Sequence, residues 1–258
     1  MKPAVTVVIT TYNESRNIAE CIESARLLTP DVIVVDTEST DNTVEIARRM
    51  KVPVHTFPFA HYVEPSRGFS IKQASGDWVF ILDADERITP ALAAEIMKSV
   101  ADAGHTYYKV PRKELFARRV WLRHGGWWPN HQIRLINRGA FKSWPERIHS
   151  TPVIAGIMGF LTEPLLHYSK NDYAQIVEKT IVFEDVESKL LYEAGRQASV
   201  PVFFRKYFGE LWRRLVKRQG YRDGGIGIIE SVYQAYSKTI TYIYLYEKKK
   251  GSSVRPVS

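Results

Sequence analysis

Hydrophobic residues follow two alternating patterns through the N-terminal part of the chain. Short, continuous apolar runs rich in β-branched residues are typical of strands that are buried on both faces of a sheet. Between these runs, apolar residues recur every three or four positions, as they do on the buried face of a helix. The alternation predicts an α/β fold in which a Rossmann-like, mostly parallel sheet carries helices on both faces. The predicted strands cover residues 5–10, 32–35, 52–57 and 78–82, and the predicted helices begin after Asn13, after Asp41, near Ser66 and at Pro90.

The pattern changes after residue 104. Aromatic and basic residues become frequent, and the extended segments near 131–136 and 164–168 are short. We expect this region, about 105–170, to complete the domain that begins with residues 1–104. From residue 171 to about 247 the spacing of apolar residues is helical, which predicts a C-terminal helical extension. The remaining residues, 248–258, are expected to form a disordered tail.

The composition indicates the cellular environment of the protein and the charge of its partners more than its function. The chain has 258 residues and one cysteine, Cys21, so no internal disulfide can form, which fits a reducing cytoplasm. We expect neither a transmembrane helix nor a signal peptide, because no uncharged apolar run is long enough and the N-terminus is β-branched. The formal net charge is +8, and Arg205 to Arg222 contains seven basic residues against one acid, Glu210. Such a segment can bind nucleic acid, anionic lipid or an anionic substrate.

The apolar run at 78–82 ends in two carboxylates, Asp83 and Asp85. In an extended strand, residues two apart point to the same face, so both would project from the carboxyl end of the strand. Two carboxylates there could hold a divalent cation against a diphosphate, as Mg²⁺ sites commonly do with few carboxylates and substrate phosphates. An Asp-x-Asp sequence is also common by chance, and a solvated turn after a buried strand would explain it without any metal.

Three polar clusters follow predicted strands, at the sheet edge where α/β proteins bind their ligands. They are residues 10–14, 36–41 and 83–85. Helix capping by Asn13 and Asp41 would explain part of two clusters without a ligand. The chain contains no glycine-rich dinucleotide fingerprint and no P-loop sequence, which removes the main support for those two classes of nucleotide site.

Three segments carry a resemblance to a known family. In chain order they are Val-Ile-Thr-Thr-Tyr-Asn-Glu, Val-Val-Asp-Thr-Glu-Ser-Thr-Asp-Asn-Thr and Gly-Asp-Trp-Val-Phe-Ile-Leu-Asp-Ala-Asp-Glu. They strongly resemble the family 2 glycosyltransferases of the GT-A fold, and most closely the lipopolysaccharide-core β-1,4-glucosyltransferase group. The likeness spans essentially the whole chain, because residues 126–135 resemble that group's acceptor-side segment and residues 217–227 its C-terminal helical region.

The resemblance implies an inverting, metal-dependent glycosyltransferase. It would move a sugar from a nucleotide donor, UDP-linked by family expectation, to a lipopolysaccharide-core or other lipid-linked acceptor. Residues 1–104 would be the donor half and 105–170 the acceptor half of the catalytic domain. Two other classes stay open. A nucleotidyltransferase would need a Gly- and Lys-rich phosphate loop early in the chain, and a non-catalytic basic protein would bind membrane or nucleic acid.

The resemblance also implies roles for individual residues. Asp85 would bind Mg²⁺ or Mn²⁺ that bridges the donor phosphates, and Asp83 would reach the ribose or the sugar. The metal would neutralise charge on the departing nucleoside diphosphate. Around it, Thr11, Tyr12 and Glu14 would line the nucleoside pocket, Asp36 would contact the uracil or ribose, and Arg67 would approach the diphosphate.

The base that deprotonates the acceptor hydroxyl is less well defined, because His149 is followed by serine where the group often has His-Glu. Glu146 could supply the carboxylate or pair with an arginine, and His149 could be a third metal ligand or contact a phosphate. Two further positions depart from the family: Thr37 replaces a frequent Asp or Ser, and Glu38 replaces a small residue, usually glycine. Both departures bear on selectivity for uracil.

Aromatic residues near the middle of the chain offer a second candidate contact. Trp127 or Trp128 could stack on the acceptor sugar, or both could belong to the core. The histidines outside these motifs show no metal-ligand spacing, so we expect them on the surface or in the core. They are His55, His61, His105, His124 and His167.

The C-terminal region contains a predicted basic amphipathic helix, which is typical of a segment that lies in a membrane interface. An enzyme with such a helix would be cytoplasmic and peripheral on the inner face of the cell membrane, and would not bind nucleic acid. The helix could instead pack on the catalytic domain, and the next helix could complete a hairpin or form a homo-oligomer contact. The apolar face comprises Phe204, Tyr207, Phe208, Leu211, Trp212 and Leu215, flanked by Arg205, Lys206, Arg213, Arg214, Lys217 and Arg218.

Overall fold

The computed structural model describes residues 4–102, 104–170 and 173–250, which form two compact units. The first unit comprises Met1–Leu115 and Pro129–Ser169, and the second comprises Phe116–Trp128 and Lys170–Ser258. The sequence placed residues 116–128 with the first domain, but they belong to the second unit. The backbone nitrogens of Arg123 and His124 both donate to the carboxylate of Asp223, at 2.8 and 2.7 Å, which ties this segment to the C-terminal region.

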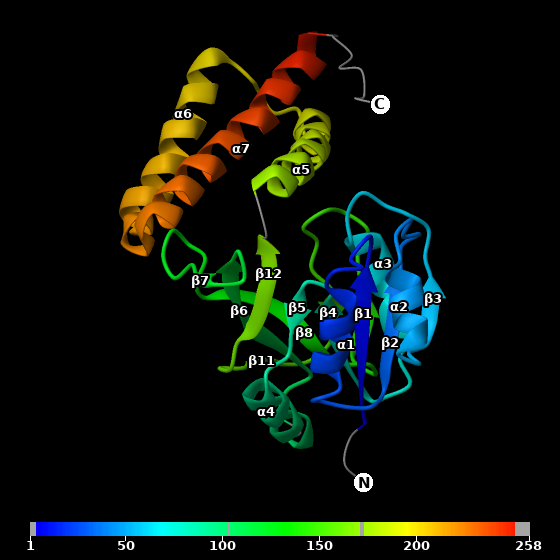
Figure 1. Cartoon of the computed structure of the whole chain (residues 1–258). Coiled ribbons are helices and arrows are strands. Elements are labelled where there is room, and N and C mark those ends of the chain that lie inside the picture. Colours follow the sequence, from blue (N-terminus) through cyan, green and yellow to red (C-terminus); the bar gives the residue numbers. More distant parts are fainter. Residues whose placement is uncertain (1–3, 103, 171–172, 251–258) are drawn as a thin grey trace. The chain divides into compact units, whose positions relative to one another are not determined.

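One large sheet organises the first unit (Figure 1). Its strands are β1 (Val5–Thr11), β2 (Val32–Asp36), β3 (Val54–Thr56), β4 (Trp78–Asp83), β5 (Glu86–Arg87), β6 (Tyr107–Phe116), β8 (Asn130–Asn137), β11 (Met158–Phe160) and β12 (Leu165–Lys170). The main path runs β3-β2-β1-β4-β8-β6-β12-β5. The first four strands on this path are parallel, whereas β8 pairs antiparallel with β4 and β6, and β12 pairs antiparallel with β5. β9 (Phe141–Ser143) and β10 (Val153–Ile154) pair separately.

Helices cover both faces of this sheet, which confirms the predicted α/β fold. Helices α1 (Ile18–Ala25), α2 (Thr43–Arg49) and α4 (Pro90–Ala101) contribute to the core on one face, and α3 (Glu64–Gln73) contributes to the core on the other. Strand β4 shows why its apolar run is continuous. Phe80 and Leu82 point into the first core, while Val79 and Ile81 point into the second, so alternate residues are buried on opposite sides.

Two local predictions at helix starts have different outcomes. Helix α4 begins at Pro90, as predicted. Asn13 does not cap α1, because that helix begins at Ile18 and Asn13 has a φ of 51°. Its side-chain oxygen instead accepts a hydrogen bond from the backbone nitrogen of Thr40, at 2.7 Å. Asn13 therefore joins the loop after β1 to the loop after β2, and so fixes the edge of the sheet.

The second unit is mainly helical, as predicted. It contains β7 (Val120–Trp121), α5 (Tyr173–Glu193), α6 (Val200–Leu211), a π-helical turn (Trp212–Lys217), a 3₁₀ turn (Gly220–Asp223) and α7 (Gly224–Lys250). Helix α7 packs against both α5 and α6. It includes residues 248–250, which were expected in the disordered tail, while residues 251–258 lie outside the described residues. No helix in the described part of the chain is long and apolar enough to cross a membrane.

Candidate active site

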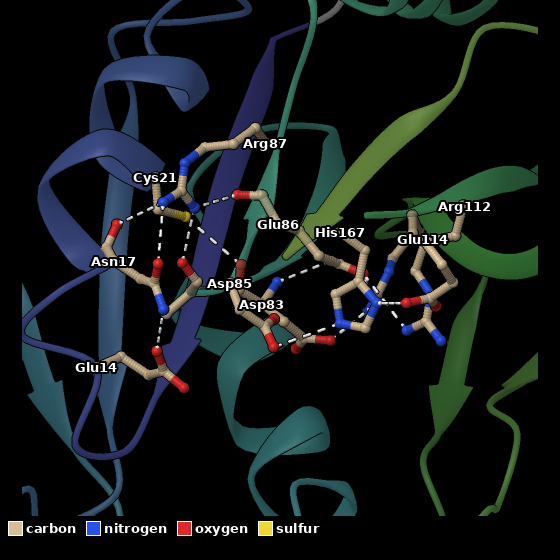
Figure 2. Close-up of polar contacts among 12 residues, drawn as sticks. Glu14, Asn17, Cys21, Asp83, Asp85, Glu86, Arg87, Arg112, Glu114 and His167 are labelled. Carbon is tan, nitrogen blue, oxygen red and sulfur yellow. Dashed lines mark hydrogen bonds and ion pairs between the residues drawn. The ribbon is translucent and has the colours of Figure 1, made fainter. Parts of the chain in front are cut away.

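The turn after β4 contains the two predicted carboxylates. Strand β4 ends at Asp83, Ala84 and Asp85 form a turn, and Glu86 begins β5 (Figure 2). The extended geometry expected through Asp85 is therefore wrong. Because the chain turns between them, the two carboxylates meet different partners.

Arg87 connects this turn to the start of α1. Its Nη1 donates to the carbonyl oxygen of Ala84 at 2.9 Å, and its Nη2 donates to the carbonyl oxygen of Asn17 at 3.1 Å. Asn17 in turn donates from Nδ2 to Oε2 of Glu14 at 2.6 Å (Figure 2). Glu14, predicted in the nucleoside pocket, thus takes part in the contacts that position the turn.

Asp83 is held by two buried arginines. Arg67 donates to its Oδ1, and Arg134 donates to its Oδ2 at 2.6 Å. Arg134 also donates to Oε1 of the fully buried Glu86, at 2.5 Å. Burial would raise the pKa of Asp83, but Arg134 and Arg67 outweigh it and hold that pKa well below its ordinary value. Burial raises the pKa of Glu86 despite Arg134, so Asp83 is the firmly ionised member of this pair.

Asp85 lies beside a histidine that the sequence did not single out. Nε2 of His167 is 3.3 Å from Oδ2 of Asp85, and Nδ1 is 2.7 Å from Oε2 of Glu114 (Figure 2). Burial and Arg112 would lower the pKa of His167, but Asp85 and Glu114 raise it to about 9. His167 is buried, as one alternative predicted, but the pairing of β12 with β5 brings it to the site.

The side chains of Asp85 and His167 fit a divalent cation provided that the imidazole gives up a proton when the cation binds, since only the neutral ring is a ligand. A carboxylate and an imidazole nitrogen are suitable ligands, and a carboxylate such as Glu114 on the opposite ring nitrogen commonly orients a metal-bound histidine. Among the described residues, no group of three or more His, Cys, Asp or Glu side chains could hold a metal. Substrate phosphates and water would therefore supply the other ligands. His149 is exposed, and its backbone nitrogen donates to Glu64 at 2.7 Å, so its role as a third ligand stays a prediction.

The residues predicted to bind the nucleoside gather at the ends of β1 and β2. Thr11 and Asp36 are buried neighbours in the parallel ladder. Tyr12 is 41% exposed, and its ring centroid lies 4.5 Å from that of Phe59. Nothing in the local sequence marks Phe59 for this role, because only the fold brings the loop after β3 beside the loop after β1. The paired rings offer a surface on which a base can stack.

Glu38 positions Phe59 at this edge. Its Oε2 accepts a hydrogen bond from the backbone nitrogen of Phe59 at 3.0 Å. Glu38 has a φ of 61°, in the left-handed region that glycine adopts without strain. The backbone conformation therefore explains why glycine is usual at this position in the family. The glutamate of this chain adds the hydrogen bond to Phe59.

Two variants separate the backbone effect from the loss of the carboxylate. Glu38→Gly and Glu38→Ala both remove the contact to Phe59, but only alanine retains a Cβ in the left-handed region. We expect Glu38→Gly to be more stable than Glu38→Ala by about 1 kcal/mol. Urea unfolding of both variants measures the difference. Equal stability would show that the backbone relaxes out of this conformation.

A cavity of about 460 Å³ opens beside Arg67 and Asp83. Trp144 and His149 line it, and Glu146, the predicted base, is exposed and does not. The structure thus brings Arg67, Asp83 and His149 together around one space but leaves Glu146 outside its lining. The role of Glu146 stays a prediction.

The tryptophans considered for acceptor stacking belong to the second unit. The guanidinium of Arg214 lies 4.9 Å from the ring centroid of Trp127, and the ring of Trp128 meets Trp121 edge-on at 5.3 Å. Both rings are half-buried among side chains of their own unit. Their contact with a sugar stays a prediction.

Residues 6–154 match the model of the family described as Glycosyl transferase family 2, and the chain belongs to this family. The predicted enzyme class, glycosyltransferase, is thereby confirmed. An uncharacterized glycosyltransferase of Rickettsia conorii is 30% identical over 263 residues, which cover 96% of this chain and 92% of that protein. The lipopolysaccharide core biosynthesis glycosyltransferase LpsC of Rhizobium meliloti is 26% identical over 264 residues, which cover 96% of this chain and 93% of LpsC.

Solved glycosyltransferase structures share the fold. S. aureus TarS in complex with UDP-GlcNAc has a TM-score of 0.51 and 14% identity, covering 99% of this chain and 93% of that structure. The mannosyltransferase PcManGT of Pyrobaculum calidifontis, in complex with GDP-Man and Mn²⁺, has a TM-score of 0.51 and 14% identity, covering 98% and 87%. These likenesses confirm the predicted GT-A fold.

Proposed function

We propose that this protein transfers a sugar from a nucleotide-sugar donor to a lipopolysaccharide-core or other lipid-linked acceptor, in a metal-assisted, inverting reaction. The observation that carries the proposal is the contact between Asp85 and His167, next to the ion pair of Asp83 with Arg67, after a parallel strand. Membership of family 2 and the similarity to LpsC support the reaction class and the kind of acceptor.

Each of these residues has a task in the proposed reaction. Asp85 and His167 would hold Mn²⁺ or Mg²⁺, which would neutralise charge on the leaving diphosphate. Arg67, fixed by Asp83, would add positive charge at the same edge. The acceptor hydroxyl oxygen attacks C1 of the sugar, the bond from C1 to the diphosphate oxygen breaks, and a carboxylate takes the hydroxyl proton. Glu146 is the predicted base, and Glu64 is the alternative because it lines the cavity.

The proposed donor is UDP-linked. TarS binds UDP-GlcNAc and PcManGT binds GDP-Man, so related folds accept both kinds of base. In this chain Tyr12 and Phe59 would stack on the base, and Thr11 and Asp36 lie behind them at the strand ends. The preference for uracil rests on the resemblance to the lipopolysaccharide-core group.

An anionic membrane at the inner face of the cell is the second proposed partner. Exposed apolar side chains, each four positions from the next, form a row on α6 and the π-helical turn that we call the α6 ridge. Exposed basic residues flank the ridge, and this combination suits a helix that lies in a lipid interface. The ridge comprises Val200, Phe204, Phe208, Trp212 and Val216, and the exposed flanking residues are Arg205, Lys206, Lys217 and Arg218.

Charge introduced on the α6 ridge should prevent membrane binding. We expect the double variant Phe208→Glu/Trp212→Glu to bind vesicles containing phosphatidylglycerol at least about tenfold more weakly than the unmodified protein, because it replaces apolar area with charge. Vesicle co-sedimentation measures the effect. Ile157→Glu is the control, since Ile157 and Trp212 are both 63% exposed but lie in different units. Undiminished binding of the double variant would rule out the ridge as the membrane contact.

The reaction itself is tested by release of nucleoside diphosphate. The protein would be incubated with Mn²⁺, purified lipopolysaccharide, and in turn UDP-glucose, UDP-galactose, UDP-N-acetylglucosamine or GDP-mannose. The proposal predicts that one donor releases its diphosphate faster when lipopolysaccharide is present, and that the lipopolysaccharide gains the mass of one sugar. Release of a sugar 1-phosphate in place of a nucleoside diphosphate would contradict it and favour a nucleotidyltransferase, because transfer of the nucleoside monophosphate from these donors leaves the sugar 1-phosphate behind.

A further inference from the structure

The cavity beside Arg67 and Asp83 carries more basic than acidic side chains. Arg67, Lys109, Arg112 and Arg134 line it, against Asp83 and Glu64. All of these residues belong to the first unit, so the cavity lies within one compact body. A partly open cavity with this balance of charge favours an anionic ligand.

The arginines of this cavity already have carboxylate partners, but the lysine does not. Arg67 and Arg134 form ion pairs with Asp83, and Nε of Arg112 lies 3.0 Å from Oε1 of Glu114. The half-buried Lys109 makes no side-chain hydrogen bond or ion pair with any described residue. Among the described residues, Lys109 is therefore the cation of the lining without an ion pair, and Glu64 is the carboxylate of the lining without one.

Apart from Nε of Arg112, which lies 3.0 Å from Oε1 of Glu114, two further groups of the lining lack a hydrogen-bond partner among the described residues, and both are donors. Nε of Arg134 and Nε1 of Trp144 are buried and form no hydrogen bond with any described residue. A buried donor without an acceptor is costly, so a ligand oxygen that reached either nitrogen would offset that cost. Such a ligand would suit Lys109 if it carried negative charge.

The cavity shares Arg67 and Asp83 with the proposed donor site but does not include the predicted nucleoside pocket. Asp85, Tyr12 and Asp36 do not line it, although Asp83 and Arg67 do. Its other lining residues come mainly from β6, β8 and the loop after β9, which belong to the predicted acceptor half. We propose that this cavity binds the acceptor through a negatively charged group of the acceptor, either a phosphate or a sugar carboxylate. Lys109 would be the principal contact, and the indole of Trp144 and the guanidinium of Arg134 would be further hydrogen-bond donors. This inference deepens the proposed function. It rests on that function only for the identification of the ligand as the acceptor.

Binding of simple sugars tests the inference on the full-length protein. Glucose 6-phosphate, glucuronate and glucose would be titrated separately, with and without UDP and Mn²⁺, and followed by saturation-transfer NMR. We expect at least one of the two anionic sugars to bind and glucose not to bind. Comparison of the two anionic sugars identifies the charged group as phosphate or carboxylate. Lys109→Gln should weaken binding of the anionic sugar at least about tenfold, because a charged hydrogen-bond donor is lost. Lys98→Gln, an exposed lysine on α4, should bind like the unmodified protein.

The affinity for UDP, measured in parallel, separates this inference from the proposed function. An anionic sugar that binds through Lys109 supports the anion site even if UDP does not bind. Equal binding in Lys109→Gln, or equal binding of glucose, overturns the inference even if UDP binds with Mn²⁺. A loss of UDP affinity in Lys109→Gln equal to the loss of sugar affinity also overturns it, because the cavity would then hold the donor diphosphate.

Discussion

Asp85→Asn is expected to lower the rate of sugar transfer by about 10³-fold or more, while leaving the fold intact. Asparagine has nearly the same shape, so the turn after β4 should persist, but one charged metal ligand is lost. Charge neutralisation by a bound cation contributes several kcal/mol to the transition state, and each 1.36 kcal/mol corresponds to about tenfold in rate. The rate of diphosphate release and the thermal unfolding curve together measure the two effects.

Asp77→Asn provides the matched control for this prediction. Asp77 immediately precedes the same strand at its opposite end, where it accepts a hydrogen bond from the backbone nitrogen of Ala4. Its replacement should leave the rate of transfer unchanged. Near-normal turnover in Asp85→Asn would sink the assignment of Asp85 to the metal.

The second large effect concerns stability. Arg134→Met should lower the free energy of unfolding by about 3–5 kcal/mol, because it leaves the half-buried carboxylate of Asp83 and the fully buried carboxylate of Glu86 without their shared partner. Chemical unfolding measures the loss. Arg48→Met, at an exposed arginine of α2, should change stability by less than about 0.5 kcal/mol.

A double variant tests the physical reason for this loss. Adding Glu86→Gln to Arg134→Met removes the buried carboxyl group that lost its arginine, so part of the stability should return. A loss below about 1 kcal/mol in Arg134→Met alone would contradict the account. It would mean that water or another cation already compensates Asp83 and Glu86.

Most of the sheet could be predicted from the sequence because its signals are local. Four β-branched or apolar runs became β1 to β4, with changes of only one or two residues at their ends. Asp83 and Asp85 were found for the same reason, since they directly follow one of these runs. Asn13 was misjudged because its side chain bonds to Thr40, a residue of another loop, and nothing in the local sequence marks that choice.

The supporting residues of the site could not be predicted, because distant strands bring them together. His167 reaches Asp85 through the antiparallel pairing of β12 with β5, and Glu114 reaches His167 from β6. A single histidine after a short apolar run gives no sign of either contact. Glu114 and Arg112 do alternate along one face of β6, and such a charged pair within a buried strand is a signal that could have identified them.

The central claim, a metal-dependent nucleotide site at Asp85, is tested most directly by thermal unfolding with UDP, GDP, CDP and dTDP, each with and without Mn²⁺. A ligand that binds only the folded protein raises its stability by about 2.7 kcal/mol at a hundredfold excess over Kd. The account predicts that UDP stabilises the protein, that the shift requires Mn²⁺, and that Asp85→Asn abolishes it. No shift with any diphosphate, or a UDP shift that is independent of both Mn²⁺ and Asp85, would contradict it.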